Sequence, residues 1–190
     1  MSKPSSSAAV KVWDLPVRLF HWSLVTAVAA LFLSAQLDAL PVHALIGEFV
    51  LGLVLLRILW GFIGSRTARF ADFVAGPKRI RRYLQTGKSE TIGHNPLGGW
   101  MILFLMAALL TQAGLGLMAN DDVSFEGPLA HLVGAHWSNL ATGAHHLLFA
   151  LLALMAAVHV GAVLVHLLIK RENLIRPMIT GWKAASSPNG

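Results

Sequence analysis

Two histidines in the last apolar segment of the chain, His145 and His159, stand 14 residues apart with almost nothing polar between them. On an α-helix this spacing is just under four turns, so both imidazoles lie on nearly the same face, roughly 21 Å apart along the axis. The hydrocarbon core of a bilayer is about 30 Å thick. A transmembrane helix with this spacing therefore offers a nitrogen ligand near each side of the membrane.

The composition indicates a membrane protein. The 190 residues are 55% hydrophobic and 13% charged, and the mean hydropathy of +0.63 lies outside the range of ordinary soluble domains. The apolar segments long enough to span a membrane are residues 17–37, 42–63, 97–118 and 144–169. We therefore expect one all-α integral membrane domain over residues 13–183, folded as a four-helix bundle.

The basic residues predict the orientation of this domain. All fifteen Lys and Arg residues fall within residues 3–18, 57–88 and 170–183, whereas the connections 38–41 and 119–143 contain acidic residues but no Lys or Arg. By the positive-inside rule, both termini lie in the cytoplasm, and we expect a multi-pass membrane protein. The net charge of +6 then reflects contact with lipid headgroups and does not indicate nucleic-acid binding.

The segments outside the spans are expected to differ in order. Residues 1–12 and 184–190 are rich in Ser and Ala and are predicted to be flexible. The loop 64–96 is too long for bare coil, and its basic segment at 77–84 is predicted to be a short helix that starts at a proline. The apolar segment 129–137 is expected to lie along the membrane interface.

The chain contains no cysteine, which excludes thiolate-ligated iron–sulfur clusters and covalently attached c-type haem. It also contains no glycine-rich dinucleotide or P-loop motif, so a nicotinamide, flavin or ATP site is not expected. Any haem would have to be held by side-chain coordination and packing alone.

Four histidines fall at two matching depths of the predicted bundle. His21 near the start of the first span shares a depth with His159, and His43 at the start of the second span shares the other depth with His145. A single intramembrane histidine commonly just hydrogen-bonds between helices. Two pairs matched in depth, each from two helices, instead favour paired ligation of a metal.

Two neutral imidazoles that face each other suit the axial positions of a haem iron. Gly47, one turn after His43, leaves room for a flat macrocycle. A zinc or manganese transporter would need carboxylates beside the histidines, and Glu48, the one acid inside a span, faces away from His43. Bis-histidine iron has no open coordination position, so the pattern favours electron transfer over oxygen binding.

The histidines and their flanking residues resemble a known family. Residues 18–22 (Arg-Leu-Phe-His-Trp) resemble the first-helix motif of the bacterial di-haem cytochrome b561 and hydrogenase-type cytochrome b family. Residues 43–47 and 56–66 resemble its second helix, and residues 145–159, followed by 171–181, resemble its fourth. The similarity covers nearly the whole chain.

This resemblance implies two b haems stacked across the bilayer, ligated by His21 with His159 and by His43 with His145, the same pairs that depth suggests. His146 directly follows His145 and is not excluded as a ligand. The resemblance also implies electron exchange with a quinone pool, a periplasmic cytochrome c, or a hydrogenase or dehydrogenase subunit. Alternatives are a haem-bearing membrane anchor for such an enzyme and, more remotely, a metal transporter.

Arg57 stands 14 residues after His43, on the same helix face and at the depth of His21 and His159. Either its side chain extends to the lipid headgroups, or it neutralises a propionate of the inner haem together with Arg18.

The remaining histidines have weaker predictions. His166 lies about 10 Å nearer the cytoplasm than His159, where it could contact a propionate or a quinone, and His94 is expected to cap the third span. A quinol site needs groups that accept protons close to a haem, and we expect it on the outer side. The titratable residues available there are His131, His136, Glu48, Asp121 and Asp122.

Overall fold

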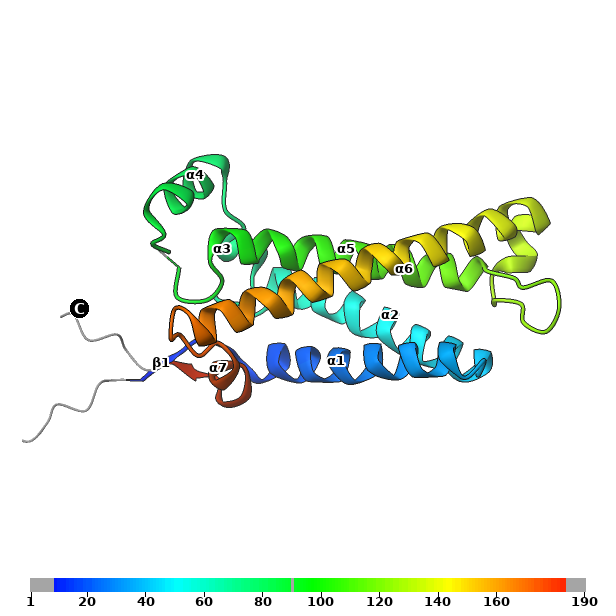
Figure 1. Cartoon of the computed structure of the whole chain (residues 1–190), viewed down its shortest axis with the longest axis horizontal. Coiled ribbons are helices and arrows are strands. Elements are labelled where there is room, and N and C mark those ends of the chain that lie inside the picture. Colours follow the sequence, from blue (N-terminus) through cyan, green and yellow to red (C-terminus); the bar gives the residue numbers. More distant parts are fainter. Residues whose placement is uncertain (1–8, 90, 184–190) are drawn as a thin grey trace, which may run out of the picture.

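The computed structural model describes residues 9–89 and 91–183. Four of its helices are long and apolar enough to cross a membrane, and they run side by side in an elongated bundle (Figure 1). They are α1 (Leu15–Gln36), α2 (Leu40–Ile63), α5 (Pro96–Met118) and α6 (Ala130–Leu168). The predicted all-α membrane bundle is confirmed, and the first three spans agree with the predicted segments to within two residues at each end.

The fourth span differs from its prediction because α6 begins well before residue 144. The helix is 39 residues long and is interrupted at Gly134, whose φ of 76° and ψ of 161° are not helical. Residues 135–143 are too polar to be recognised as part of a membrane span, although they continue the helix. The segment 129–137 contains the start of α6 and this kink, and its position along the membrane interface stays a prediction.

The bundle consists of two helical hairpins. Helix α1 packs on α2, α5 packs on α6, and α2 joins the hairpins by packing on α5. Val50 and Val54 of α2 are almost fully buried beside Ala27 of α1, and Leu109 of α5 packs against this cluster. Most other large apolar side chains of the spans are exposed on the bundle surface, as expected for helices that face lipid.

Both described ends of the chain meet at one end of the bundle, which we call the terminal end. Strand β1 (Val10–Lys11) pairs antiparallel with β2 (Trp182–Lys183), and the N–H of Val12 donates to the carbonyl of Gly181 at 2.8 Å. The short helix α7 (Ile175–Thr180) precedes β2. The opposite end, where residues 119–129 connect α5 to α6, is the loop end.

This pairing corrects part of the predicted flexible N-terminus. Val12 is only 3% exposed and packs with Trp13, Val17 and Ala68. The contact joins segments that are about the whole chain length apart, so local composition could not reveal it. The rest of the predicted flexible segments, residues 1–8 and 184–190, lies outside the described residues.

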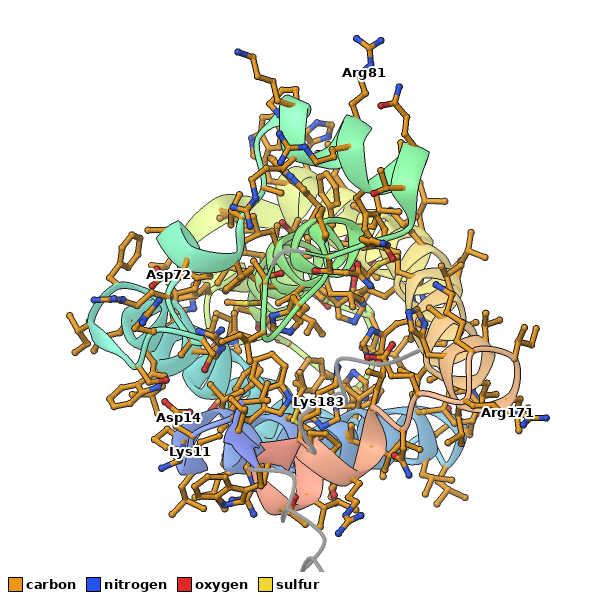
Figure 2. All side chains as sticks on the ribbon, turned by 90° about the vertical axis from the view of Figure 1, so that its left-hand side faces the viewer. Lys11, Asp14, Asp72, Arg81, Arg171 and Lys183 are labelled. Atoms are coloured by element: carbon orange, nitrogen blue, oxygen red, sulfur yellow. The ribbon has the colours of Figure 1, made fainter. Side chains whose placement is uncertain are left out.

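The connection between α2 and α5 contains two short helices, α3 (Phe70–Phe73) and α4 (Pro77–Thr86). Helix α4 confirms the predicted helix that starts at a proline, and it ends at Gly87 in the left-handed conformation. Figure 2, which views the terminal end, shows the side chain of Arg81 on α4 directed away from the bundle. This basic helix is therefore placed to meet solvent or lipid headgroups.

Two side chains cap the helices that start at the terminal end. The carboxylate of Asp14 accepts the N–H of Val17 at 3.0 Å at the start of α1, and the side chain of Asn95 accepts the N–H of Gly98 at 2.8 Å at the start of α5. The prediction that His94 caps the third span is therefore wrong, because its neighbour has the position and the oxygen that a cap requires.

Gly181 is expected to be essential for the contact between the chain ends. Its φ is 87°, and a Cβ there would lie 2.8 Å from the carbonyl oxygen of Trp13. We expect Gly181→Ala to destabilise this end by about 1–3 kcal/mol, the usual cost of one strained backbone conformation. The midpoint of thermal unfolding in detergent should fall. Gly161→Ala is the control, because a Cβ at Gly161 would meet open space, and equal midpoints would contradict the prediction.

Candidate functional site

The structure brings two of the four predicted ligands together at the loop end. The ring centroids of His43 on α2 and His145 on α6 lie 6.1 Å apart, with their planes inclined by 77°. Two imidazoles that share one metal, each through a bond of about 2 Å, would have centroids about 6 Å apart. The spacing therefore fits two ligands on opposite sides of one iron atom.

Hydrogen bonds to carbonyl groups orient both of these rings. Nδ1 of His43 lies 3.0 Å from the carbonyl oxygen of Leu31 on α1, and Nδ1 of His145 lies 3.0 Å from that of Gln112 on α5. Because a carbonyl oxygen only accepts, each ring carries its proton on Nδ1 and has a free lone pair on Nε2. Second-shell bonds of this kind fix the tautomer and orientation of histidine ligands in metalloproteins.

Helix α5 contributes two residues that the sequence analysis missed. The side-chain amide of Gln112 donates to the carbonyl of His145 at 3.0 Å, so Gln112 is bonded to His145 through both its main chain and its side chain. One turn later, Gly116 leaves room for the ring, since a Cβ there would lie 3.1 Å from Cε1 of His145. The sequence feature that could have indicated this contact is a glutamine, Gln112, within an apolar span and one turn before Gly116.

The neighbouring His146 is placed differently. Its side chain is exposed, and its ring meets that of His145 at a centroid distance of 6.3 Å. The structure therefore presents His145, and not His146, to His43. Gly47, predicted to leave room for a macrocycle, has open space where a side chain would begin.

At the terminal end, His21 on α1 and His159 on α6 are both half-buried and close enough for their charges to interact. Nδ1 of His21 is buried and has no hydrogen-bond partner within the described residues. A buried polar atom without a partner costs about 1–3 kcal/mol. Such an atom fits a site whose ligand is not part of the polypeptide.

Arg57 does not extend to the headgroups, so that alternative is wrong. Its side chain is 4% exposed, donates from Nη2 to the carbonyl of Ala68 at 3.0 Å and lies 5.6 Å from the ring centre of Phe70. Its Nη1 is buried and, among the described residues, unpartnered. Arg18 likewise donates from Nη2 to the carbonyl of Ile179 while its Nε stays unpartnered. Both guanidiniums therefore keep a donor available for an anionic group.

His94 is a further half-buried residue at this end, and its Nδ1 is buried. Its ring packs between Trp13 and Phe73, with centroid distances of 4.5 and 5.0 Å, and its Nδ1 has no partner in the described part of the chain. Burial lowers the pKa of His94 to about 3, and the positive charge of the nearby Arg57 acts in the same direction. His94 is therefore neutral at physiological pH.

The residues predicted for a quinol site on the loop side are only partly suitable. His131 and His136 are exposed in the first part of α6, whereas Glu48 is exposed on the side of span α2. The carboxylate of Asp121, in contrast, accepts the N–H groups of residues 123–125, and these hydrogen bonds hold its pKa well below the ordinary range. Asp121 stays ionised and is a poor proton acceptor.

His166, the alternative candidate for a quinone contact at the terminal end, lies near the end of α6. Its Nδ1 donates to the carbonyl of Ala162 at 2.9 Å, and its Nε2 lies 3.4 Å from Nζ of Lys170. The ring therefore already has two local partners and is directed along its own helix.

Neither histidine pair gains a third protein ligand. In residues 9–89 and 91–183 no three His, Asp or Glu side chains are grouped so as to hold a metal ion. Each pair offers two nitrogen ligands, which is the number that the axial positions of a haem iron require. An all-α membrane bundle with such pairs belongs to the class of b-type membrane cytochromes.

A family model described as prokaryotic cytochrome b561 matches residues 12–181, and the chain belongs to this family. The predicted resemblance is confirmed. The protein is a multi-pass membrane cytochrome with b-type haem that transfers electrons.

Relatives of this chain include hydrogenase cytochromes. It is 28% identical to a probable Ni/Fe-hydrogenase B-type cytochrome subunit of Azotobacter vinelandii, over 95% of this chain and 91% of the relative. It is 26% identical to that of Bradyrhizobium diazoefficiens, over 90% and 85%. A probable Ni/Fe-hydrogenase 1 B-type cytochrome subunit of Escherichia coli K12 is 28% identical over 58% and 61%. No solved structure matches significantly.

The space left by Gly116 generates a prediction about haem content. A branched side chain in Gly116→Val would enter the volume of the His145 ring and displace it, so haem at the loop end should be lost or depleted. Gly114→Val is the matched control on the same helix, because a Cβ at Gly114 meets nothing within 4 Å. Absorption spectra of the purified variants measure the outcome, and unchanged haem content in Gly116→Val would contradict the role of this glycine.

Proposed function

We propose that the chain binds two b haems, one between His43 and His145 and one between His21 and His159, and that it conducts electrons across the membrane. The observation that carries this proposal is the loop-end pair, whose ring centroids lie 6.1 Å apart and whose Nδ1 carbonyl bonds leave the Nε2 lone pairs free. When bound there, haem supplies one-electron redox chemistry. The protein supplies the ligands, their tautomer and an apolar surrounding.

The terminal-end pair is supported by the unpartnered polar atoms around it. Nδ1 of His21, Nε of Arg18 and Nη1 of Arg57 are all buried and without partners in the described residues. Haem brings two propionate carboxylates, and guanidinium groups bind carboxylates well. We propose that Arg18 and Arg57 bind these carboxylates.

The part of the bundle between the two proposed haem sites is suited to electron transfer. The ligands on α6 are roughly 21 Å apart along one helix, which fixes their separation. Between their levels, Phe32 of α1 and Phe149 of α6 stack with ring centroids 6.4 Å apart.

We propose that the terminal end faces the cytoplasm and the loop end the periplasm of a bacterial inner membrane. The pairing of β1 with β2 places both described chain ends at the same end of the bundle. The Lys and Arg residues of the described ranges also lie in segments of that end, and the loop-end connections contain none. This asymmetry is what the positive-inside rule requires.

The partners are proposed from the relatives and from the chemistry of the site. Several relatives are named as hydrogenase cytochrome subunits, which supports a hydrogenase as the electron donor and an anchor role as a second function. Quinone is proposed as the other electron carrier, because it dissolves in the membrane around the bundle. A periplasmic cytochrome c or a dehydrogenase would be alternative partners, and co-purification with a large subunit would identify the anchor role.

Haem quantification tests the di-haem proposal. The purified protein should contain two haems per chain, and His21→Ala or His159→Ala should remove one haem while His43→Ala or His145→Ala removes the other. His146→Ala serves as the control, since its exposed ring is not presented to His43. One haem per chain in the wild-type protein, or loss of haem in His146→Ala but not in His145→Ala, would refute the assignment.

Quinol-driven haem reduction tests the side of the quinone site. We propose the loop end, where the side chains of His131, His136 and Glu48 are exposed. Alanine at each of these residues should slow reduction by quinol at unchanged haem content, and His166→Ala should leave the rate unaltered. Full activity in all three loop-end variants, with loss in His166→Ala, would place the site at the terminal end.

A further inference from the structure

One buried nitrogen at the terminal end has no role in the function proposed above. This atom is Nδ1 of His94, which has no hydrogen-bond partner among the described residues. The sequence analysis assigned His94 to a helix cap, but Asn95 makes that bond. Because a buried polar atom is costly to leave unpaired, Nδ1 of His94 fits a hydrogen bond to a group that the polypeptide does not supply.

Aromatic packing holds the ring of His94 in place. It lies between Trp13 and Phe73, with centroid distances of 4.5 and 5.0 Å. The preceding residue is also held closely, since a Cβ at Gly93 would lie 3.1 Å from the ring of Trp13. The hydroxyl of Thr91 donates to the carbonyl of His94. The backbone and the ring are therefore both fixed, and Nδ1 points to a defined place inside the protein.

This place is beside the proposed haem site of the terminal end. Ala68, whose carbonyl accepts from Nη2 of Arg57, belongs to the same buried cluster as the tryptophan that packs on His94. The charges of Arg57, His159 and His21 all act on His94. Among the described residues, however, no three such side chains are grouped closely enough to hold one metal ion. His94 therefore lies at the edge of the site and is not a third ligand.

Every helix of the bundle then supplies nitrogen atoms to this end. Helix α1 carries Arg18 and His21, α2 carries Arg57, and α6 carries His159. Helix α5 has no such residue of its own at this level, but His94 directly precedes the residue that caps it. The position of His94 is thus the contribution of α5 to the site.

A neutral donor suits the charges of this site. A haem has two propionate carboxylates, and Arg18 and Arg57 supply two positive charges. Burial lowers the pKa of His94 to about 3, and the positive charge of Arg57 acts in the same direction, so the ring is neutral at physiological pH. A neutral imidazole still donates one N–H. It can therefore add a hydrogen bond to a carboxylate without adding a third positive charge.

We propose that His94 donates from Nδ1 to a propionate carboxylate of the haem held by His21 and His159. This inference rests on the di-haem function proposed above. His94 is then a haem-binding residue that does not touch the iron. The two guanidiniums balance the charge of the propionates, and the fixed imidazole determines where one of these carboxylates lies.

Transfer of haem to an excess of apomyoglobin tests the proposal on the purified holoprotein. The terminal-end haem is measured alone in a His43→Ala background, which lacks the loop-end haem. His94→Phe keeps a ring between Trp13 and Phe73 but has no N–H. Haem should leave this variant about tenfold to a hundredfold faster, the effect of one lost hydrogen bond to a charged group. An unchanged rate would overturn the inference.

Resonance Raman spectra separate the hydrogen bond from packing, because the propionate bending band responds to donors on the carboxylate. The band should shift in His94→Phe. His94→Gln, which restores an N–H donor, should return the band and the transfer rate toward the wild-type values. His146→Phe is the control, since its exposed ring lies at the loop end. Faster haem transfer with an unmoved band would show a packing role and overturn the inference. His94→Leu provides the same test if His94→Phe does not fold.

The outcomes separate this inference from the proposed function. Fewer than two haems per wild-type chain would refute the di-haem proposal itself. Two haems per chain, with wild-type transfer rate and propionate band in His94→Phe, would refute only the role of His94 and leave the ligand pairs intact.

Discussion

A polar group inside a bilayer must find its partner within the protein, and this constraint determines how the histidines are held. His43 is bonded to a carbonyl of α1 and His145 to a carbonyl of α5. Each ring is thus bonded to the other helix of its own hairpin while it faces a histidine of the opposite hairpin. The same bonds that hold each hairpin together determine which nitrogen is free to bind metal.

The two ends of the bundle meet the constraint in different ways. At the loop end, the ligand rings have protein partners, and Gln112 adds a second bond to His145. At the terminal end, several buried nitrogens have none among the described residues, including those of His21, Arg57 and His94. Buried nitrogens without a protein partner fit a site in which a bound group pairs with them.

Much of this arrangement follows from local patterns. The lengths of the spans can be predicted from the sequence because hydropathy is regular along each segment. Regular helical spacing likewise predicts the depths of the four candidate ligands, His21, His43, His145 and His159. The burial of Arg57 could not be predicted from the sequence, because it depends on contacts with Ala68 and Phe70 in the connection after α2. The role of Gln112, the position of His94 and the pairing of β1 with β2 likewise arise from contacts between distant segments.

The length of α6 has a geometric consequence. After the kink at Gly134 the helix continues to Leu168 over roughly 51 Å, which exceeds the hydrocarbon thickness of about 30 Å. From His145 back to Gly134 the helix rises about 16 Å. Because this part of α6 is a continuous helix, a molecule bound at the Gly134 turn would lie at a fixed distance from the imidazole of His145.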